Sequence, residues 1–193
     1  MKVAIVKYNA GNIRSVLYGL ERIGIAATVT DDHSVIKKAD KVIFPGVGEA
    51  SSTMAYLRDK GLDELLKNLT QPVLGICLGQ QLMCSRSDEG DTSCIGIFDV
   101  PVIRFEPLEK VPHMGWNKLY NMKNDLFKGL GDDPFVYFVH SFYVPVCGDT
   151  AACCNYITEF SAALQKNNFF ATQFHPEKSG GPGQKILKNF IEL

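Results

Sequence analysis

The pentapeptide Gly75-Ile76-Cys77-Leu78-Gly79 carries the strongest chemical signature in the chain. It stands between a short apolar run, typical of a buried strand, and a stretch that we expect to be helical. A side chain at such a tight turn projects above the sheet, and small flanking residues relieve the crowding around it. The following helix N-terminus favours a thiolate. The segment therefore predicts a cysteine nucleophile, although a small buried thiol at a strand end has the same local sequence.

A nucleophilic cysteine needs a base, and His175 is the best candidate among the four histidines of the chain. It lies in the segment Gln-Phe-His-Pro-Glu at residues 173–177, directly after a strand-like run. Pro176 disfavours helix, and side chains two apart in an extended segment point the same way, so we expect Glu177 beside His175. Cys77, His175 and Glu177 together predict a catalytic triad. Taken alone, His175 would more commonly be a turn histidine hydrogen-bonded to a neighbour.

The Pro-Gly-Val-Gly loop at residues 45–48 follows another apolar run, and we expect it at the same edge of the sheet as Cys77. Glycines let backbone N–H groups turn toward a developing negative charge, which an oxyanion hole requires. The expected donors are the N–H groups of Val47 and Leu78. The same loop composition is also typical of an ordinary connection between a strand and a helix.

The remaining polar residues carry weaker signals. The six cysteines include no Cys-x-x-Cys pair, so they do not indicate a zinc or redox motif. The glycine-rich stretch at residues 180–185 lacks the spacing of a phosphate-binding loop. We expect His140 to be a hydrogen-bonded residue at a strand end, and His33, beside two aspartates, to be solvated.

Alternating elements must position these side chains. Strand-like runs occupy residues 3–6, 25–30, 41–44 and 73–76, and helical stretches occupy 12–23, 34–39, 52–68 with a break near Gly61, and a region from about 80. This alternation predicts a parallel sheet covered on both faces, with ligands beyond the carboxyl ends of its strands. The strand-like runs at 135–139, 151–156, 161–165 and 169–174 are separated by turns, so we expect a mixed or antiparallel extension. We expect Asn12 to cap the first helix and Pro182 to begin the last.

Composition limits the classes of function. The 193 residues are 46% hydrophobic and 21% charged, which is typical of one globular domain, expected to span residues 1–193. The net charge of −1 provides no basic excess for nucleic acid. The sequence contains no apolar run long enough for a membrane span or a secretion signal, so we expect a cytoplasmic protein whose cysteines stay reduced.

Three motifs make the sequence similar to the triad-type, class I glutamine amidotransferases. They are the pentapeptide extended through Gln80 and Gln81, the 45–48 loop, and Gln-Phe-His-Pro-Glu-Lys-Ser-Gly at residues 173–180. Segments 11–16, 112–117 and 137–143 further resemble the histidine-biosynthesis branch, the glutaminase subunits of imidazole glycerol phosphate synthase. The resemblance covers essentially the whole chain. It implies a flavodoxin-like three-layer α/β sandwich, with a mostly parallel central sheet and an antiparallel extension.

The resemblance also implies roles for single residues. Cys77 would be the nucleophile, His175 the base and acid, and Glu177 the orienting carboxylate. The residues expected to contact the substrate glutamine are Gly46, Gly48, Gln81, Ser141 and Phe142. The residues expected to meet a cyclase subunit, a (β/α)8 barrel that completes a heterodimer, are Asn12, Met114, Trp116 and Lys178. Trp116 is equally compatible with a cap on the local core. The resemblance implies no cofactor, metal, nucleic acid or membrane.

The same resemblance predicts how the activity is controlled. Glutamine would be hydrolysed to glutamate and ammonia through a thioester, and the ammonia would pass by a shielded path to the cyclase. The cyclase would form imidazole glycerol phosphate and an aminoimidazole-carboxamide ribonucleotide. We expect partner and ribonucleotide together to turn the Val47 N–H into the site, so that the chain alone hydrolyses glutamine very slowly.

Three residues depart from the family pattern, and three other functions stay open at this stage. Lys7 replaces an acidic residue, Asn9 a glycine and Phe142 a tyrosine; we expect position 142 to act through its backbone. The first alternative is a glutaminase that feeds pyridoxal phosphate, anthranilate or guanine-nucleotide synthesis. The second is a cysteine peptidase or deglycase of similar fold. The third is a binding module without activity, which the intact triad argues against.

Overall fold

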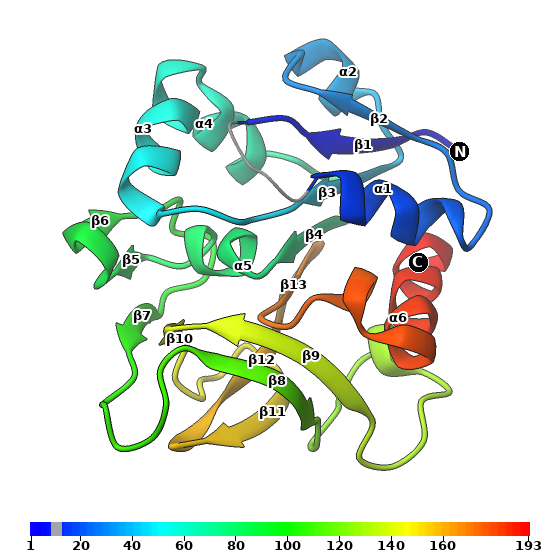
Figure 1. The fold of residues 1–193 in the computed structure, drawn as a ribbon. Coiled ribbons are helices and arrows are strands. Elements are labelled where there is room, and N and C mark those ends of the chain that lie inside the picture. Colours follow the sequence, from blue (N-terminus) through cyan, green and yellow to red (C-terminus); the bar gives the residue numbers. More distant parts are fainter. Residues whose placement is uncertain (9–12) are drawn as a thin grey trace.

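A seven-stranded sheet forms the centre of the computed structural model, which describes residues 1–8 and 13–193 (Figure 1). Its strand order is β11-β12-β13-β4-β3-β1-β2. The strands are β1 (Val3–Val6), β2 (Ala27–Thr30), β3 (Lys41–Phe44), β4 (Val73–Ile76), β11 (Thr150–Tyr156), β12 (Thr158–Lys166) and β13 (Phe169–Thr172). The strands from β13 to β2 pair in parallel, whereas β12 and β11 pair antiparallel at one edge. The predicted mostly parallel sheet with an antiparallel extension is confirmed.

Helices cover both faces of this sheet, which gives the predicted three layers (Figure 1). The helices are α1 (Ile13–Glu21), α2 (His33–Lys37), α3 (Ala50–Asp59), α4 (Leu62–Lys67), α5 (Leu78–Leu82) and α6 (Gly180–Glu192). Successive strand residues point to opposite faces, so β1 contributes Val3 and Ile5 to the core with α1 and α6. Its residues Ala4 and Val6 join the second core, with α2 to α5.

The chain between α5 and β11 forms smaller elements outside the central sheet. They are β5 (Arg86–Ser87), η1 (Glu89–Asp91), β6 (Thr92–Ser93), β7 (Pro101–Arg104), β8 (His113–Lys118), η2 (Asp125–Phe127), β9 (Phe135–His140) and β10 (Phe142–Tyr143). A further 3-10 helix, η3 (Pro176–Lys178), precedes α6. Strand β9 pairs with β8 in a separate two-stranded sheet, so the 135–139 run does not belong to the extension of the central sheet.

Helix boundaries differ from the sequence expectations by up to about two residues, and the starts of α5 and α6 lie next to the site. Helix α5 begins at Leu78, directly after the elbow and about two residues earlier than expected. Helix α6 begins at Gly180, so Pro182 stands in its first turn instead of opening it; a first-turn residue needs no N–H partner within the helix, which makes proline acceptable there. Gly61 separates α3 from α4 with a φ of 62°, as expected for a helix break. The predicted cap Asn12 lies outside the described residues.

Among residues 1–8 and 13–193, no helix is both long enough and apolar enough to cross a bilayer. The expectation that residues 1–193 form one domain stays a prediction.

Candidate active site

Cys77 occupies the turn between β4 and α5 in a backbone conformation that side chains rarely adopt. Its φ is 54° and its ψ is −111°. The Cys77 N–H donates to the Thr172 carbonyl over 2.7 Å, and the Cys77 carbonyl accepts the first-turn N–H of Gln81 over 3.2 Å. Strand β13 and helix α5 thus hold this strained residue from both sides, which is the geometry predicted for a nucleophile elbow. The side chain is largely buried, with 8% of the residue exposed.

The elbow packs so closely on the end of β3 that the contact requires glycine. A Cβ on Gly79 would lie 2.1 Å from the Phe44 carbonyl oxygen, and one on Gly46 would lie 2.2 Å from the Gly79 nitrogen. These contacts bring the 45–48 loop directly against the start of α5. A Cβ on Gly46 would face the helix backbone, and Gly46 is not among the residues that line the pocket described below, so its contact with substrate stays a prediction.

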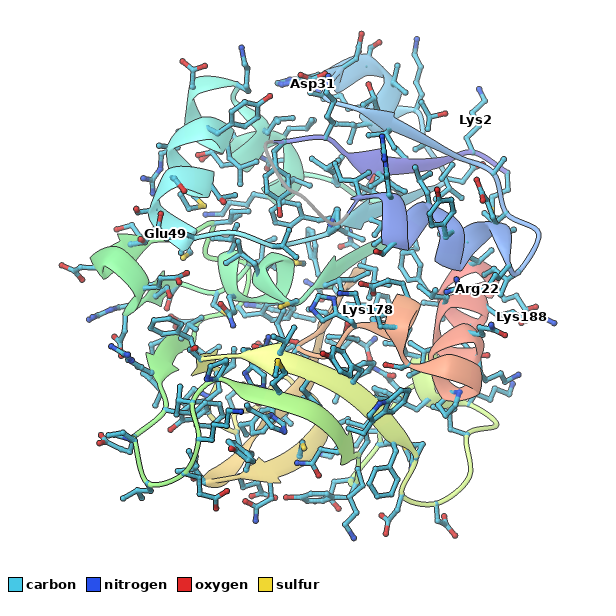
Figure 2. All side chains as sticks on the ribbon, viewed as in Figure 1. Lys2, Arg22, Asp31, Glu49, Lys178 and Lys188 are labelled. Atoms are coloured by element: carbon cyan, nitrogen blue, oxygen red, sulfur yellow. The ribbon has the colours of Figure 1, made fainter. Side chains whose placement is uncertain are left out.

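His175 and Glu177 form a buried pair next to the elbow. The His175 Nδ1 lies 2.8 Å from the Glu177 Oε1, and the two side chains are 1% and 0% exposed. The expected contact is present, but the expected extended backbone is wrong: Pro176 opens the 3-10 helix η3, which turns Glu177 back toward the ring. Arg22, at the end of α1, donates to the Glu177 carbonyl over 2.7 Å and ties η3 to that helix (Figure 2).

The surroundings of His175 favour its protonated form, the imidazolium. Burial lowers the pKa of His175, but the nearby Cys77, and Glu177 through its hydrogen bond and its charge, raise the pKa to about 10. Because Glu177 occupies Nδ1, the ring keeps Nε2 for the thiol. The arrangement therefore favours a thiolate beside an imidazolium, in which the histidine already holds the proton that a leaving group needs.

A pocket of about 330 Å³ opens above these residues. Its walls comprise Val47, Gly48, Cys77, Leu78, Gln81, Glu89, Pro112, Val139, His140, Ser141, Phe142 and His175. Every residue expected to form the oxyanion hole or to contact substrate lies on this wall except Gly46. His140, expected only as a satisfied strand-end residue, also lines it.

The 45–48 loop, which contains the predicted oxyanion donor Val47, is anchored by Tyr8. The Tyr8 hydroxyl donates to the Pro45 carbonyl. Burial raises the pKa of Tyr8, and the nearby Val47 N–H lowers it in part. Tyr8 thus holds the Pro45 side of the loop, two residues before Val47.

Sequence reasoning missed Glu89, a carboxylate on the pocket wall. Its Oε2 accepts the Ala50 N–H over 2.9 Å at the start of α3. Burial raises the pKa of Glu89, the Ala50 bond lowers it, and the charge of Glu49 raises it. A cationic group in the pocket would favour the ionised form of Glu89 and so oppose the effect of burial on its pKa. No short motif marked Glu89, since only the fold of the chain after α5 brings it to Cys77.

The residues predicted to meet a partner lie in the open. Met114 and Trp116 lie on the same outer face of β8 and are 58% and 55% exposed. Trp116 therefore does not cap the core. Lys178 on η3 is exposed as well (Figure 2). A Cβ on Gly180 would lie 3.9 Å from the Trp116 ring, which places the start of α6 beside that side chain. Asn12, the fourth predicted contact, lies outside the described residues.

The other cysteines and histidines form no second reactive centre in the described part of the chain. All six cysteines are free thiols. No group of three or more histidine, cysteine or acidic side chains among residues 1–8 and 13–193 is arranged to hold a metal ion. His33 is exposed, as expected, and its Nε2 lies 2.9 Å from the Lys60 carbonyl.

Known proteins share both this sequence and this fold. The model of the class-I glutamine amidotransferase family matches residues 5–193. The curated imidazole glycerol phosphate synthase subunit HisH of Bacteroides fragilis is 64% identical over 196 residues, and that of Escherichia coli K12 is 45% identical; each alignment covers 100% of both chains. A crystal structure of a glutamine amidotransferase superposes with a TM-score of 0.77 at 18% identity, covering 98% of this chain and 97% of that one, which is a likeness of fold alone.

Proposed function

The chain belongs to the class-I glutamine amidotransferase family, and on that premise we propose that it is the glutaminase subunit of an imidazole glycerol phosphate synthase. The proposal follows the printed function of relatives that are 43–64% identical over the full chain. The observation that carries the chemistry is the Cys77 elbow beside the buried His175–Glu177 pair. A peptidase, a deglycase or an inactive module does not account for both the relatives and this site.

The proposed reaction has two halves. The Cys77 thiolate attacks the side-chain amide carbon of glutamine, and the Leu78 and Val47 N–H groups receive the charge on the carbonyl oxygen. His175 gives its proton to the departing nitrogen, the C–N bond breaks, and ammonia leaves a thioester behind. His175 then takes a proton from water as the water attacks the thioester. The C–S bond breaks, glutamate is released and the thiolate returns.

The ammonia has to reach a second active site before it is protonated in water. We propose that a cyclase subunit, a (β/α)8 barrel, docks on Met114, Trp116 and Lys178 and receives the ammonia across that interface as the partner in a heterodimer. Exposed aromatic and sulfur side chains on one strand face are suited to anchor such a contact. The complex would act in the cytoplasm, in histidine biosynthesis.

One assay tests this function directly. Glutamate release is measured for the chain alone, with the cyclase barrel, and with the barrel and its ribonucleotide substrate. We expect very slow release from the chain alone and fast release from the complete mixture. Equal release in all three mixtures would contradict the regulation, and no release in any of them would contradict the glutaminase function.

Glu89 is expected to bind the α-ammonium group of glutamine. In Glu89→Gln, an amide oxygen can still accept the Ala50 N–H, so the fold is retained while the charge is lost. We expect the KM for glutamine to rise by about 10- to 100-fold, as for loss of a charged hydrogen bond, with a much smaller change in kcat. Steady-state kinetics of the activated complex measure both. The control Asp91→Asn removes a carboxylate of the same 3-10 helix that is 96% exposed; an equal KM effect there would reject the assignment.

Tyr8 is expected to keep the isolated chain inactive. Tyr8→Phe removes the hydroxyl that donates to the Pro45 carbonyl. Because this releases the 45–48 loop, so that Val47 can turn its N–H toward the pocket, we expect the rate of glutamate release without partner to rise several-fold. Tyr120→Phe is the matched control, since it removes a hydroxyl that contacts only Glu159 among the described residues, over 2.9 Å. An unchanged basal rate in Tyr8→Phe would show that Tyr8 does not hold the loop.

A further inference from the structure

The Phe142 carbonyl accepts two hydrogen bonds that determine how the neighbouring side chains are oriented. The Gln81 Nε2 lies 3.0 Å from this oxygen, and the His140 Nδ1 lies 2.7 Å from it. A carbonyl oxygen can only accept, so both nitrogens must carry hydrogen. One backbone oxygen therefore fixes both the amide orientation of Gln81 and the tautomer of His140. The flipped amide and the tautomer with hydrogen on Nε2 would each leave that oxygen facing an acceptor.

On the Gln81 side, the bonds continue to the nucleophile. The Gln81 Nε2 also donates to the Gln173 Oε1 over 2.9 Å. Since Gln173 uses its oxygen for that bond, its NH2 group faces the other way and lies 3.7 Å from the Cys77 Sγ. Gln173 is fully buried, with 0% exposed. A buried amide N–H is thus directed at the sulfur atom, and the orientation of that amide traces back to the Phe142 carbonyl.

On the His140 side, the bonds continue away from the pocket. The His140 Nε2, left with a lone pair, accepts from the His113 Nδ1 over 2.9 Å. The His113 Nε2 then accepts a longer bond, 3.4 Å, from the Asn117 amide. Burial lowers the pKa of His140 to about 3 and that of His113 to about 4, so both rings are neutral at pH 7. Neutral rings allow each to donate once and accept once, as the bonds require.

Packing keeps this histidine pair in place. The His113 ring stacks on Phe138 at 4.9 Å and on Tyr156 at 4.1 Å between ring centres. His113 is 4% exposed and His140 is 5% exposed. Neither histidine can easily turn its ring, because turning breaks a hydrogen bond in a buried site, where leaving a polar group unpaired is unfavourable.

We propose that Gln173 is a catalytic residue that stabilises the Cys77 thiolate through its amide N–H, and that Gln81, His140 and His113 are positioning residues that keep this amide turned toward the sulfur. The bond favours the thiolate over the thiol, because a hydrogen bond to the charged form stabilises that form. The inference rests on the proposed role of Cys77 as nucleophile and adds to it a donor outside the predicted triad.

The test measures the reactivity of Cys77 without any need for turnover. The full chain is treated with iodoacetamide between pH 5 and 10, and alkylation of each cysteine is followed by peptide mass spectrometry. In the wild type, we expect Cys77 to react faster than the other five thiols. Gln173→Met keeps the side-chain volume but removes the donor, and should slow Cys77 alkylation at pH 7 on the order of tenfold, with the pH midpoint shifted upward.

Two further variants make the result specific. Gln173→Glu keeps the oxygen that accepts from Gln81 but places a second oxygen at the sulfur, and should slow Cys77 at least as much as Gln173→Met; it also serves if the methionine variant fails to fold. His113→Phe keeps the ring between Phe138 and Tyr156 but removes both nitrogens, and should slow Cys77 by a smaller factor, about threefold.

The matched control is Gln80→Met. Gln80 is also fully buried, but its amide donates to the Ser161 carbonyl over 3.2 Å and takes no part in these bonds. We expect Cys77 to react within about twofold of the wild-type rate in this variant. A wild-type rate in Gln173→Met and Gln173→Glu, or equal slowing in Gln80→Met, would overturn the role of Gln173, and a wild-type rate in His113→Phe would overturn the histidine side. If Cys77 of the wild type reacts no faster than the other thiols, the nucleophile assignment fails as well.

Discussion

Replacing Cys77 by alanine is expected to abolish glutamine hydrolysis in the complete complex, with a fall in kcat of at least about 10⁴-fold. Loss of a triad nucleophile has an effect of this size or larger in other hydrolases, because no covalent intermediate can form. The measurement is glutamate release with saturating partner and ribonucleotide. The variant should still fold, since alanine removes only a sulfur atom from a side chain that stands at the pocket wall.

The appropriate control is another thiol. Cys94→Ala changes a partly buried cysteine that packs against the core but does not line the pocket, and its Sγ donates a hydrogen bond to the Thr92 carbonyl over 3.6 Å. We expect this variant to retain nearly all activity. If Cys77→Ala hydrolysed glutamine at the wild-type rate, or if Cys94→Ala were equally inactive, Cys77 could not be assigned as the nucleophile.

Replacing Glu177 by glutamine is expected to lower kcat on the order of 10³-fold or more. An amide can occupy the same volume beside His175, but it carries no negative charge to stabilise the imidazolium, and its NH2 group can fix the wrong tautomer. Kinetics of the activated complex measure the loss. Glu192→Gln is the control, since Glu192 forms only an exposed pair with Lys188 over 3.7 Å among the described residues, and its removal should have no effect on kcat.

The same variant has a defined pH dependence. The pKa of His175 is raised from 6.5 to about 10 in the folded chain. The charged imidazole therefore stabilises the fold fully below about pH 6.5, and this contribution is lost as the pH rises through 10, where the imidazole gives up its proton. In the wild type, kcat/KM should therefore decline above about pH 10, when the proton needed by the departing nitrogen is lost. In Glu177→Gln this decline should begin at lower pH. Identical alkaline limbs would show that Glu177 does not raise the pKa of His175.

Local sequence predicted the elbow because its requirements are local. A buried strand, a glycine two positions before and after Cys77 and a following helix are all visible within a few positions, and the structure confirms the strand and the helix. The parallel order of β1, β3 and β4 was also predictable, because alternating strands and helices have few compatible topologies. The contact between His175 and Glu177 was predicted for the wrong reason, since the geometry of η3 and not an extended backbone brings the two side chains together.

Other parts of the site depend on contacts between distant segments. Glu89 reaches the pocket only because the chain after α5 folds back over it, and Gln173 faces Cys77 only because β13 lies beside β4. Glu89 stands in no pattern whose period or composition indicates chemistry, and Gln173 opens the 173–180 motif, in which the sequence indicated catalytic roles only for His175 and Glu177. Tyr8 likewise depends on a distant contact, since it is 37 residues from its hydrogen-bond partner Pro45. The local pattern of a single sequence does not indicate which distant residues come into contact.

The close approach of Gly46 to Gly79 makes the 45–48 loop and the Cys77 elbow one rigid unit. With so little space between their backbones, neither segment can be shifted or enlarged unless the other moves, because overpacked cores lose stability. Anyone who grafts this chemistry onto another scaffold, or recombines it with a distant relative, would have to exchange residues 44–48 and 75–79 together. Crossovers between these two segments should yield inactive chimaeras even when each half is acceptable alone.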